Sequence, residues 1–149
     1  MKIIIGSDHG GFKLKQTIKE YIEKLGYDVK DVGTDSSESV DYPIYAKRVA
    51  EQVAKDKNKL GILVCGTGLG MCMAANKVKG IRAALCYNES SAKLAKEHNN
   101  ANILCLGGRE LKEELAKKIT KTFLETPFSD EERHKRRIKE IADLEKWIS

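Results

Sequence analysis

The stretch Gly61–Met71, GILVCGTGLGM, ends an apolar run with Cys65 and follows it with three glycines at alternating positions. A short aliphatic run that stops at a glycine loop is typical of a buried strand followed by a tight turn into a helix. Such a loop lets a ligand approach the backbone closely, because glycine has no side chain. The central question is what a thiol does at the mouth of this loop.

Short apolar runs and amphipathic stretches alternate along the whole chain, which is the pattern of β-α-β units on a parallel sheet. The predicted strands are 2–7, 28–32, 60–65, 82–87 and 102–106. The predicted helices cover 14–25, a segment that begins at 41–43, and about 69–79, 89–99 and 110–124. We therefore expect an α/β fold with a doubly wound five-stranded parallel sheet, helices on both faces, and the common strand order 2-1-3-4-5.

The C-terminal segment is polar and strongly charged. Pro127 breaks the preceding helix, and we expect a helical tail over about 129–148, capped by Ser129. The chain of 149 residues has no internal repeat or linker, so we expect one domain over 1–149. A chain of this length buries roughly 68–70% of its unfolded surface, which is enough for a real core.

Composition narrows the setting of the protein. The net charge is +5, but the 33% of charged residues carry both signs, which describes solvated helix faces better than a nucleic-acid surface. The positive net charge still allows a small anion as the ligand. The four cysteines form no C-x-x-C pair, and no apolar run is long enough for a signal peptide or membrane span. A reduced cytoplasmic protein without a membrane or nucleic-acid partner is expected.

The topology predicts where the loops with reactive side chains meet. With strands 2–7 and 60–65 side by side, their connections leave toward opposite faces, and a crevice opens beyond their carboxyl ends. The first strand is followed by Ser7–Gly11, SDHGG, and the third by the loop Cys65–Gly70, CGTGLG. We therefore expect these two loops to form one ligand site.

Several interpretations of the glycine loop compete. A dinucleotide site requires G-x-G-x-x-G, but the spacing here is G-x-G-x-G on the third strand, although Glu89 could contact a ribose. A cysteine phosphatase would have an arginine where Met71 stands, and the Gly-Lys-Ser/Thr of a P-loop is absent. A plain turn with a buried thiol is the structural alternative. It is the expected role of Cys86 and Cys105 inside strands, and Cys72 is also assigned a structural role.

Against the structural alternative stands the chemistry of the loop. Successive backbone N–H groups at a helix N-terminus form a nest that favours negative charge, including a thiolate on Cys65. A base beside an anion cradle suits removal of a proton next to a carbonyl, because the resulting enediolate carries its charge on oxygen.

Five motifs in order carry a resemblance to a known family: GSDHGG, SVDYP, VCGTGLG followed by AANKVKGIRAA, EHNNANILCLGGR and RHKRR. Together they cover essentially the whole chain and closely resemble ribose-5-phosphate isomerase type B. The resemblance implies a Rossmann-like subunit in a homodimer, sometimes a tetramer. It also implies interconversion of ribose 5-phosphate and ribulose 5-phosphate in the pentose phosphate pathway, without metal or cofactor. The same superfamily includes galactose-6-phosphate isomerase subunits, which act on a hexose phosphate, so hexose phosphates such as allose or galactose 6-phosphate remain open as substrates. A non-catalytic module that binds a phosphorylated ligand is the alternative from another class.

The resemblance also implies roles for individual residues. Cys65 corresponds to the base at C2, Thr67 assists it, and His98 with Asp8 opens the sugar ring. The enediolate would be held by the amides of Gly66, Thr67, Gly68, Leu69 and Gly70. The positions that match substrate-binding residues are Asp8, His9, Asn99, Arg109, Arg133 and Arg137.

Physical reasoning supports several of these roles. A histidine can donate or accept a proton at neutral pH, as ring opening requires, although a surface or capping role is the commoner one for a lone histidine. Arg133 and Arg137 lie i, i+4 on one helical face and could close on one phosphate, while a solvated basic face is the alternative. Asp41 is explained equally well as a helix cap.

The predicted topology separates two of these residues. His98 ends a helix that runs back to the amino edge of the sheet, whereas Cys65 lies at the carboxyl edge, about 20 Å away for a strand of six residues. We therefore expect the active site to be shared between two subunits.

Overall fold

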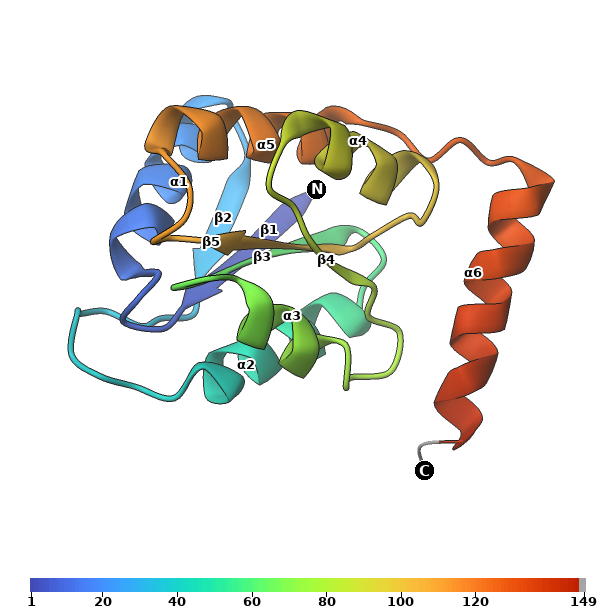
Figure 1. Ribbon diagram of the computed structural model, residues 1–149, viewed down its shortest axis with the longest axis horizontal. Helices are drawn as coiled ribbons and strands as arrows, with labels where there is room; N and C mark the ends of the chain where they lie inside the picture. Colours follow the sequence, from blue (N-terminus) through green and yellow to red (C-terminus); the bar gives the residue numbers. More distant parts are fainter. Residues whose placement is uncertain (148–149) are drawn as a thin grey trace.

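The computed structural model describes residues 1–147 as a parallel sheet with helices on both faces and a helical arm (Figure 1). The strands are β1 (Lys2–Ser7), β2 (Asp28–Asp31), β3 (Lys59–Cys65), β4 (Ala83–Leu85) and β5 (Ile103–Gly107). The helices are α1 (Phe12–Lys24), α2 (Tyr42–Ala54), α3 (Leu69–Ala75), α4 (Glu89–Glu97), α5 (Glu113–Glu125) and α6 (Glu132–Leu144), followed by the 3₁₀ turn η1 (Glu145–Trp147). The predicted doubly wound α/β fold is confirmed.

The predicted strand order is wrong at one edge of the sheet. The order is β2-β1-β3-β5-β4, so β5 and not β4 lies beside β3. All five residues of β5 are buried, whereas β4 has only three residues, all partly exposed. The fully apolar strand takes the central place, where helices cover both of its faces, and the short strand forms the edge. The adjacency of β1 and β3 is as predicted.

The sheet separates two apolar cores. Ile3 and Ile5 of β1 point to the side covered by α1, α4 and α5, whereas Ile4 points to the side covered by α2 and α3. Figure 1 shows the same two layers above and below the sheet. The alternation follows from the two-residue period of a strand, and nearly all positions are apolar because both faces are covered.

Local signals position the helix ends. Leu14, Ile18 and Ile22 form the buried stripe of α1, and Gly26 follows the helix with a φ of +93°, a conformation that favours glycine. Asp41 occupies the N-cap position of α2 ahead of Pro43, although its side chain makes no capping hydrogen bond. These boundaries position the loops at the carboxyl ends of β1 and β3.

Helix α6 stands apart from the α/β body as an arm (Figure 1). Among its residues only His134 is buried. The helix begins three residues later than the predicted tail, with Glu131 at the N-cap, so the prediction that Ser129 caps it is wrong. The Ser129 hydroxyl instead pairs with the His134 ring. Residue 148, the end of the predicted tail, lies outside the described residues.

A buried lysine ties α1 to the end of β2. The Lys15 side chain is fully buried, and its ammonium donates to Asp31 Oδ1 at 2.8 Å and to the Thr34 carbonyl at 2.6 Å. Because a buried ammonium needs such partners, the contacts hold the segment that follows β2 against the body. Further along that segment, the Val40 amide donates a hydrogen bond to His9 Nδ1, in the loop after β1.

No helix within residues 1–147 combines the length and the apolar character needed to cross a membrane.

Candidate active site

The loop after β3 places backbone donors around the thiol of Cys65. The Cys65 side chain is buried, and its Sγ accepts a hydrogen bond from the Gly68 amide at 3.1 Å. Gly68 has a φ of +79°, and a Cβ there would lie 2.5 Å from Leu85 Cδ1. Glycine is therefore required at this position on both conformational and steric grounds. A backbone donor at the sulfur stabilises negative charge on it.

Only some of the backbone N–H groups predicted to bind an anion are free. The Gly68 amide is directed at the Cys65 sulfur, and the Leu69 amide donates to Thr67 Oγ1 at 3.2 Å. The amides of Gly66, Thr67 and Gly70 are then the remaining candidates to hold an oxyanion. Thr67 itself is exposed, and its hydroxyl is in place to contact a ligand as well as the loop.

The loop after β1 lies directly against the end of β3. The Asp8 amide donates to the Val64 carbonyl, and Asp8 Oδ1 accepts from the Gly11 amide at 3.0 Å. His9 Nδ1 accepts from the Val40 amide at 3.2 Å. A neutral His9 ring therefore carries its proton on Nε2, which leaves that nitrogen as a donor.

Arg109 joins the same site from the loop after β5. Its amide donates to the Gly66 carbonyl at 2.9 Å. A Cβ on Gly66 would lie 3.2 Å from Arg109 Nη1, and one on Gly10 would lie 3.4 Å from its Cζ, so the guanidinium lies over both loops. Within residues 1–147 it makes no ion pair, which leaves it available for an anion. This proximity depends on the corrected strand order, because β5 is the neighbour of β3.

A second cluster forms at the opposite edge of the sheet, where α4 ends. The His98 ring lies 4.3 Å from the His134 ring, measured between centroids, with an interplanar angle of 32°. His134 Nδ1 lies 2.8 Å from Ser129 Oγ. His98 is half-buried at the C-cap of α4, so this cluster joins the end of that helix to the arm.

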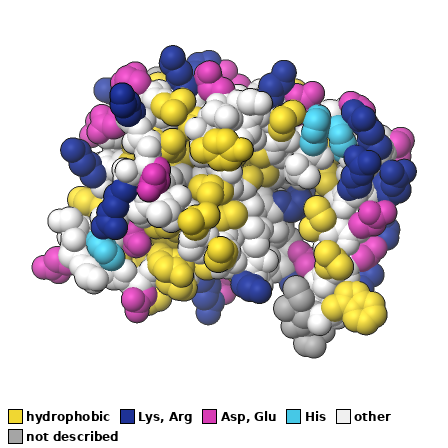
Figure 2. All heavy atoms as spheres, in the orientation of Figure 1, with side chains coloured by type: hydrophobic (Ala, Val, Ile, Leu, Met, Phe, Trp, Pro, Cys, Tyr) yellow, Lys and Arg dark blue, Asp and Glu magenta, His cyan; other side chains and the backbone are white. Residues whose placement is uncertain are grey.

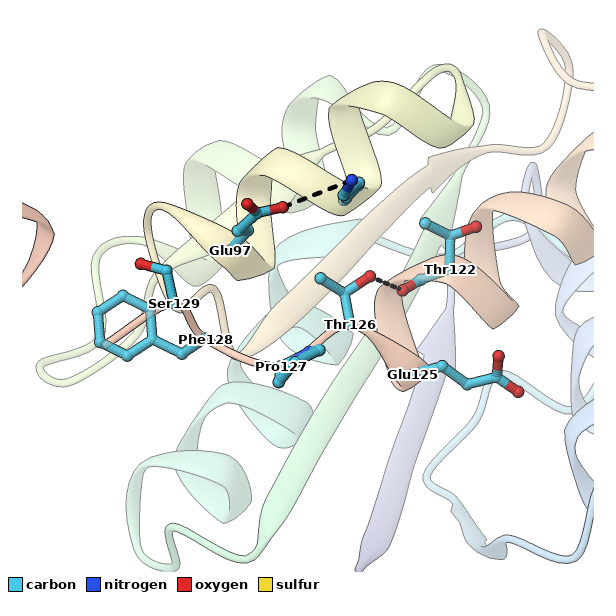
Figure 3. Close-up of a pocket in the computed structure, with 8 residues that line it drawn as sticks. Glu97, Thr122, Glu125, Thr126, Pro127, Phe128 and Ser129 are labelled. Atoms are coloured by element: carbon cyan, nitrogen blue, oxygen red, sulfur yellow. Dashed lines mark hydrogen bonds and ion pairs between the residues drawn. The ribbon is translucent and has the colours of Figure 1, made fainter. Parts of the chain in front are cut away.

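Figure 3 shows the junction between α4, α5 and the segment that leads to the arm. The Ser129 amide donates to the Glu97 carbonyl at 3.0 Å, and Thr126 Oγ1 donates to the Thr122 carbonyl at 2.6 Å. These bonds border a cavity of about 440 Å³ with a largely apolar lining that includes Pro127. They fix the start of the arm beside His98.

The predicted phosphate residues Arg133 and Arg137 lie on the arm, near His98. Both are exposed, and Arg133 Nε pairs with Glu131 Oε2 at 2.8 Å. Asn99 is also exposed at this edge, where its carbonyl accepts from Arg82 Nε at 3.2 Å. The carboxyl edge holds Cys65 at the far end of β3, and a seven-residue strand spans about 20 Å. Within one chain, the predicted site residues therefore form two separate groups.

Sequence reasoning missed two residues beside these groups. His134 was part of the RHKRR motif, but nothing in the sequence indicated that its ring would contact His98. Tyr42, from the SVDYP motif, borders the glycine loop, since a Cβ on Gly70 would lie 2.6 Å from its ring. Desolvation lowers the pKa of His134, and repulsion by His98 and Arg133 lowers it further.

The remaining cysteines differ in their surroundings. The pKa of Cys72 is lowered to about 7, chiefly by a hydrogen bond with Cys105, and its Sγ lies 3.5 Å from the Ala83 carbonyl. Burial raises the pKa of Cys86 to about 11. The pKa of Cys105 is raised well above its ordinary value by its hydrogen bond with Cys72 and by complete burial. Cys72 is therefore half-buried and polar in its contacts, not simply part of the core.

Over residues 1–147 no group of three or more histidine, cysteine, aspartate or glutamate side chains has the arrangement of a metal site.

Comparison with known proteins identifies the family of this site. A family model described as Ribose/Galactose Isomerase matches residues 3–141. The chain belongs to the Ribose/Galactose Isomerase family. Its sequence is similar to ribose-5-phosphate isomerase B of Escherichia coli, with 44% identity over 97% of this chain and 96% of that protein. The resemblance drawn from the five motifs is confirmed, and the protein is an isomerase of this family.

Two solved structures of the Ribose/Galactose Isomerase family are especially similar. Ribose-5-phosphate isomerase B of Clostridium thermocellum has a TM-score of 0.97 and 50% identity, with 100% of both chains covered. The enzyme from Mycoplasma genitalium, described with bound ribulose-5-phosphate, has a TM-score of 0.93 and 46% identity, covering 97% of this chain and 96% of that one.

Proposed function

We propose that the protein interconverts D-ribose 5-phosphate and D-ribulose 5-phosphate through an enediolate. The observation that carries the proposal is the Cys65 thiol, which receives the Gly68 amide at 3.1 Å in a glycine loop beneath the Arg109 guanidinium. Family membership and the similarity to a structure described with bound ribulose-5-phosphate support this choice of substrate.

The proposed chemistry is a proton transfer between two carbons. Cys65, as thiolate, takes the proton from C2 of the open-chain aldose, and the C2–H electron pair moves to form the C1–C2 double bond while charge develops on O1. The free loop amides of Gly66, Thr67 and Gly70 stabilise that charge. Cys65 then returns the proton to C1 while the O2 proton passes to O1, which leaves O1 as a hydroxyl and O2 as the ketose carbonyl. No electrons leave the substrate, so no redox cofactor takes part.

Ring opening and binding use the other residues. Ribose 5-phosphate is mainly a furanose ring, so an acid must protonate the ring oxygen while a base accepts the C1 hydroxyl proton. We assign these roles to His98 and Asp8. Thr67 supports the base, and His9 and Asn99 contact hydroxyls. Arg109, Arg133 and Arg137 bind the phosphate.

This assignment requires two subunits for each site. Cys65 and His98 lie at opposite edges of one chain, too far apart for one five-carbon sugar, so His98 and the arm would serve the site of a neighbouring copy. The exposed apolar side chains support a partner surface: Leu69 and Met73 on α3, and Leu144 and Trp147 on the arm. Figure 2 shows hydrophobic side chains gathered on the body and again on the arm, with histidines at two opposite ends of this face. We propose a homodimer as the minimal active unit.

The test of the function is direct. The protein is incubated with ribose 5-phosphate in heavy water, and the products are followed by NMR. We expect ribulose 5-phosphate, with deuterium at C2 of the aldose that returns through the enediolate. A phospho-ligand-binding module without chemistry would produce neither, and that result would refute the proposal.

The role of Cys65 has its own test. We expect Cys65→Ser to keep the fold and phosphate binding but to lose turnover by about 10²–10⁴-fold, because a hydroxyl is too weak an acid to replace the thiolate base. Cys72→Ser is the matched control, a half-buried thiol on the neighbouring helix, and should retain most of the turnover. Near-normal activity of Cys65→Ser would remove Cys65 from its role.

The preferred sugar is decided by comparing kcat/KM for ribose 5-phosphate, allose 6-phosphate and galactose 6-phosphate. The family description names both ribose and galactose. We expect ribose 5-phosphate to give the highest value, and a higher value for either hexose phosphate would reassign the substrate while keeping the chemistry.

A further inference from the structure

A separate, polar cavity lies at the amino edge of the sheet, at the end of the strands opposite to Cys65. Its volume is about 490 Å³, and it opens beside the start of β3 and the turns before β4 and β5. The polar side chains in its lining are Lys57, Asn58, Lys59, Arg82, Lys96, Asn100 and Asn102. None of them belongs to the proposed catalytic residues.

The lining is strongly cationic. Four of these side chains are basic, and no carboxylate contributes to the lining. Two carboxylates lie outside it and are engaged: Asp56 pairs with Lys59 at 3.6 Å, and Glu145 accepts from the Gly80 amide at 2.7 Å and attracts Arg82 through space. The positive charge of the cavity therefore exceeds the negative charge beside it.

One of the cations, Lys96, is buried, a second, Arg82, is half-buried, and neither forms an ion pair within the described residues. The Lys96 residue is 8% exposed, and the hydrogen bond of its ammonium goes to the Ala101 carbonyl at 3.3 Å. Within residues 1–147, neither Lys96 nor Arg82 has a carboxylate oxygen within 4.0 Å. Burial lowers the pKa of Lys96, and repulsion by Arg82 lowers it further. A buried and a half-buried cation side by side destabilise one another, and a bound anion would offset that cost.

The donors in the cavity are already held in position. Arg82 Nε donates to the Asn100 carbonyl at 3.0 Å and Nη2 donates to the same oxygen at 2.9 Å, while the described residues offer Nη1 no acceptor. The Lys96 ammonium lies 5.4 Å from the centre of the Phe123 ring, which fixes its position. A site with fixed donors loses little entropy when a ligand binds.

We propose that this cavity is a second anion site, which binds the phosphate group of a small phosphorylated metabolite between Lys96 and the free edge of Arg82. Its volume falls within the range of small-molecule sites, about 300–1,000 Å³. Phosphate is the matching group because it offers several acceptor oxygens to an ammonium and a guanidinium together. Lys57, Lys59 and the asparagines of the lining then contact the rest of the ligand.

The test measures phosphate binding where the catalytic site can no longer contribute. In an Arg109→Met, Arg133→Met, Arg137→Met variant, inorganic phosphate is titrated by calorimetry, and we expect saturable residual binding at one site per chain. Adding Lys96→Met should weaken it about tenfold or more, the worth of one charge-assisted hydrogen bond. Lys47→Met is the matched control, an exposed lysine of α2 paired with Glu51, and should leave it unchanged. Residual binding that is absent, or unaffected by Lys96→Met, overturns the proposal.

Two further measurements complete the design. If Lys96→Met does not fold, as shown by circular dichroism, Arg82→Met takes its place and should weaken binding in the same direction, with unchanged binding counting against the site. The affinity of the folded background variant for ribose 5-phosphate is then compared with its affinity for inorganic phosphate. Tighter binding of the sugar phosphate supports a metabolite, and equal binding supports free phosphate as the source of the same chemistry. Because isomerase activity is not the readout, failure of the proposed function leaves this test intact.

Discussion

Cys65 and Cys72 are seven residues apart in the sequence, yet their surroundings give the two thiols different properties. Cys65 is buried at the end of β3 and receives the Gly68 amide at 3.1 Å. Cys72 is half-buried on α3, beside Cys105 and the Asn76 amide. Reactivity follows the thiolate fraction and access, so any experiment that modifies thiols must separate these two residues.

We expect Cys72 to react with iodoacetamide in a strongly pH-dependent way. With a pKa of about 7, the Cys72 thiol is mainly protonated at pH 6 and mainly thiolate at pH 8. Its alkylation rate should therefore rise about tenfold over that range, because only the thiolate reacts. Peptide mass spectrometry measures the rate for each cysteine.

Cys86 is the internal control, because its pKa is raised to about 11 and it should stay unmodified until the protein unfolds. A flat profile for Cys72 between pH 6 and pH 8 would contradict the assigned thiolate. Loss of isomerase activity on alkylation is attributed to Cys65 only if it persists in Cys72→Ser and if substrate protects against it.

At the scale of one element, α6 combines charge with little packing. Its one buried residue, His134, lies against His98, and most of its other side chains are exposed. Arg133 and Arg137 lie one turn apart on the same face, while Arg136 Nε comes within 4.0 Å of Glu140. The arm is therefore built to present side chains rather than to stabilise its own subunit.

Replacing Arg133 or Arg137 with methionine should raise the KM for ribose 5-phosphate by about 10- to 100-fold, the range for a charge-assisted hydrogen bond. Turnover of unphosphorylated ribose, where measurable, should change little, since the lost contact is with the phosphate. Steady-state kinetics on both sugars checks this.

Arg136→Met removes the same charge from the same helix and should leave KM close to that of the unmodified protein. Equal losses on the phosphorylated and unphosphorylated sugars would instead show that the arm has only a structural role.

At the scale of the whole molecule, the sheet divides the proposed site residues between its two edges. Asp8, His9, Cys65 and Arg109 gather at the carboxyl edge, while His98 lies with the arm at the amino edge. A rigid sheet cannot bring these edges together, so a second copy is the simplest way to complete the site.

Mixing Cys65→Ala chains with His98→Asn chains should therefore restore activity. Each variant is expected to be nearly inactive alone. A mixed dimer has one site with both defects and one with neither, so random pairing should recover roughly a quarter of the unmodified activity. Activity is measured after co-expression, with formation of mixed dimers verified by mass. If both residues acted within one chain, every mixed site would carry one defect and no activity would return.

The sequence by itself determined the elements and the loops of the site. The two-residue and 3.6-residue periods of apolar side chains predicted all five strands and the helices between them, because both periods arise from contacts among residues close in sequence. The adjacency of β1 and β3, and with it the meeting of the loops after Ser7 and Cys65, followed from the usual topology of such folds. The glycine pattern predicted a loop whose backbone a ligand can approach closely, and the structure adds that Gly68 in this loop has a positive φ.

Only the tertiary structure decided which distant residues meet. Two apolar runs competed for the place beside β3, and β5 took it because all of its residues are buried between helices on both faces. That choice brings Arg109 over Gly66, which the predicted order would have placed farther away. The contact between His98 and His134, and the burial of Lys96 and Arg82 around one cavity, depend on packing between elements. A local pattern cannot predict them, because side chains of the same types are far more often solvated on a surface.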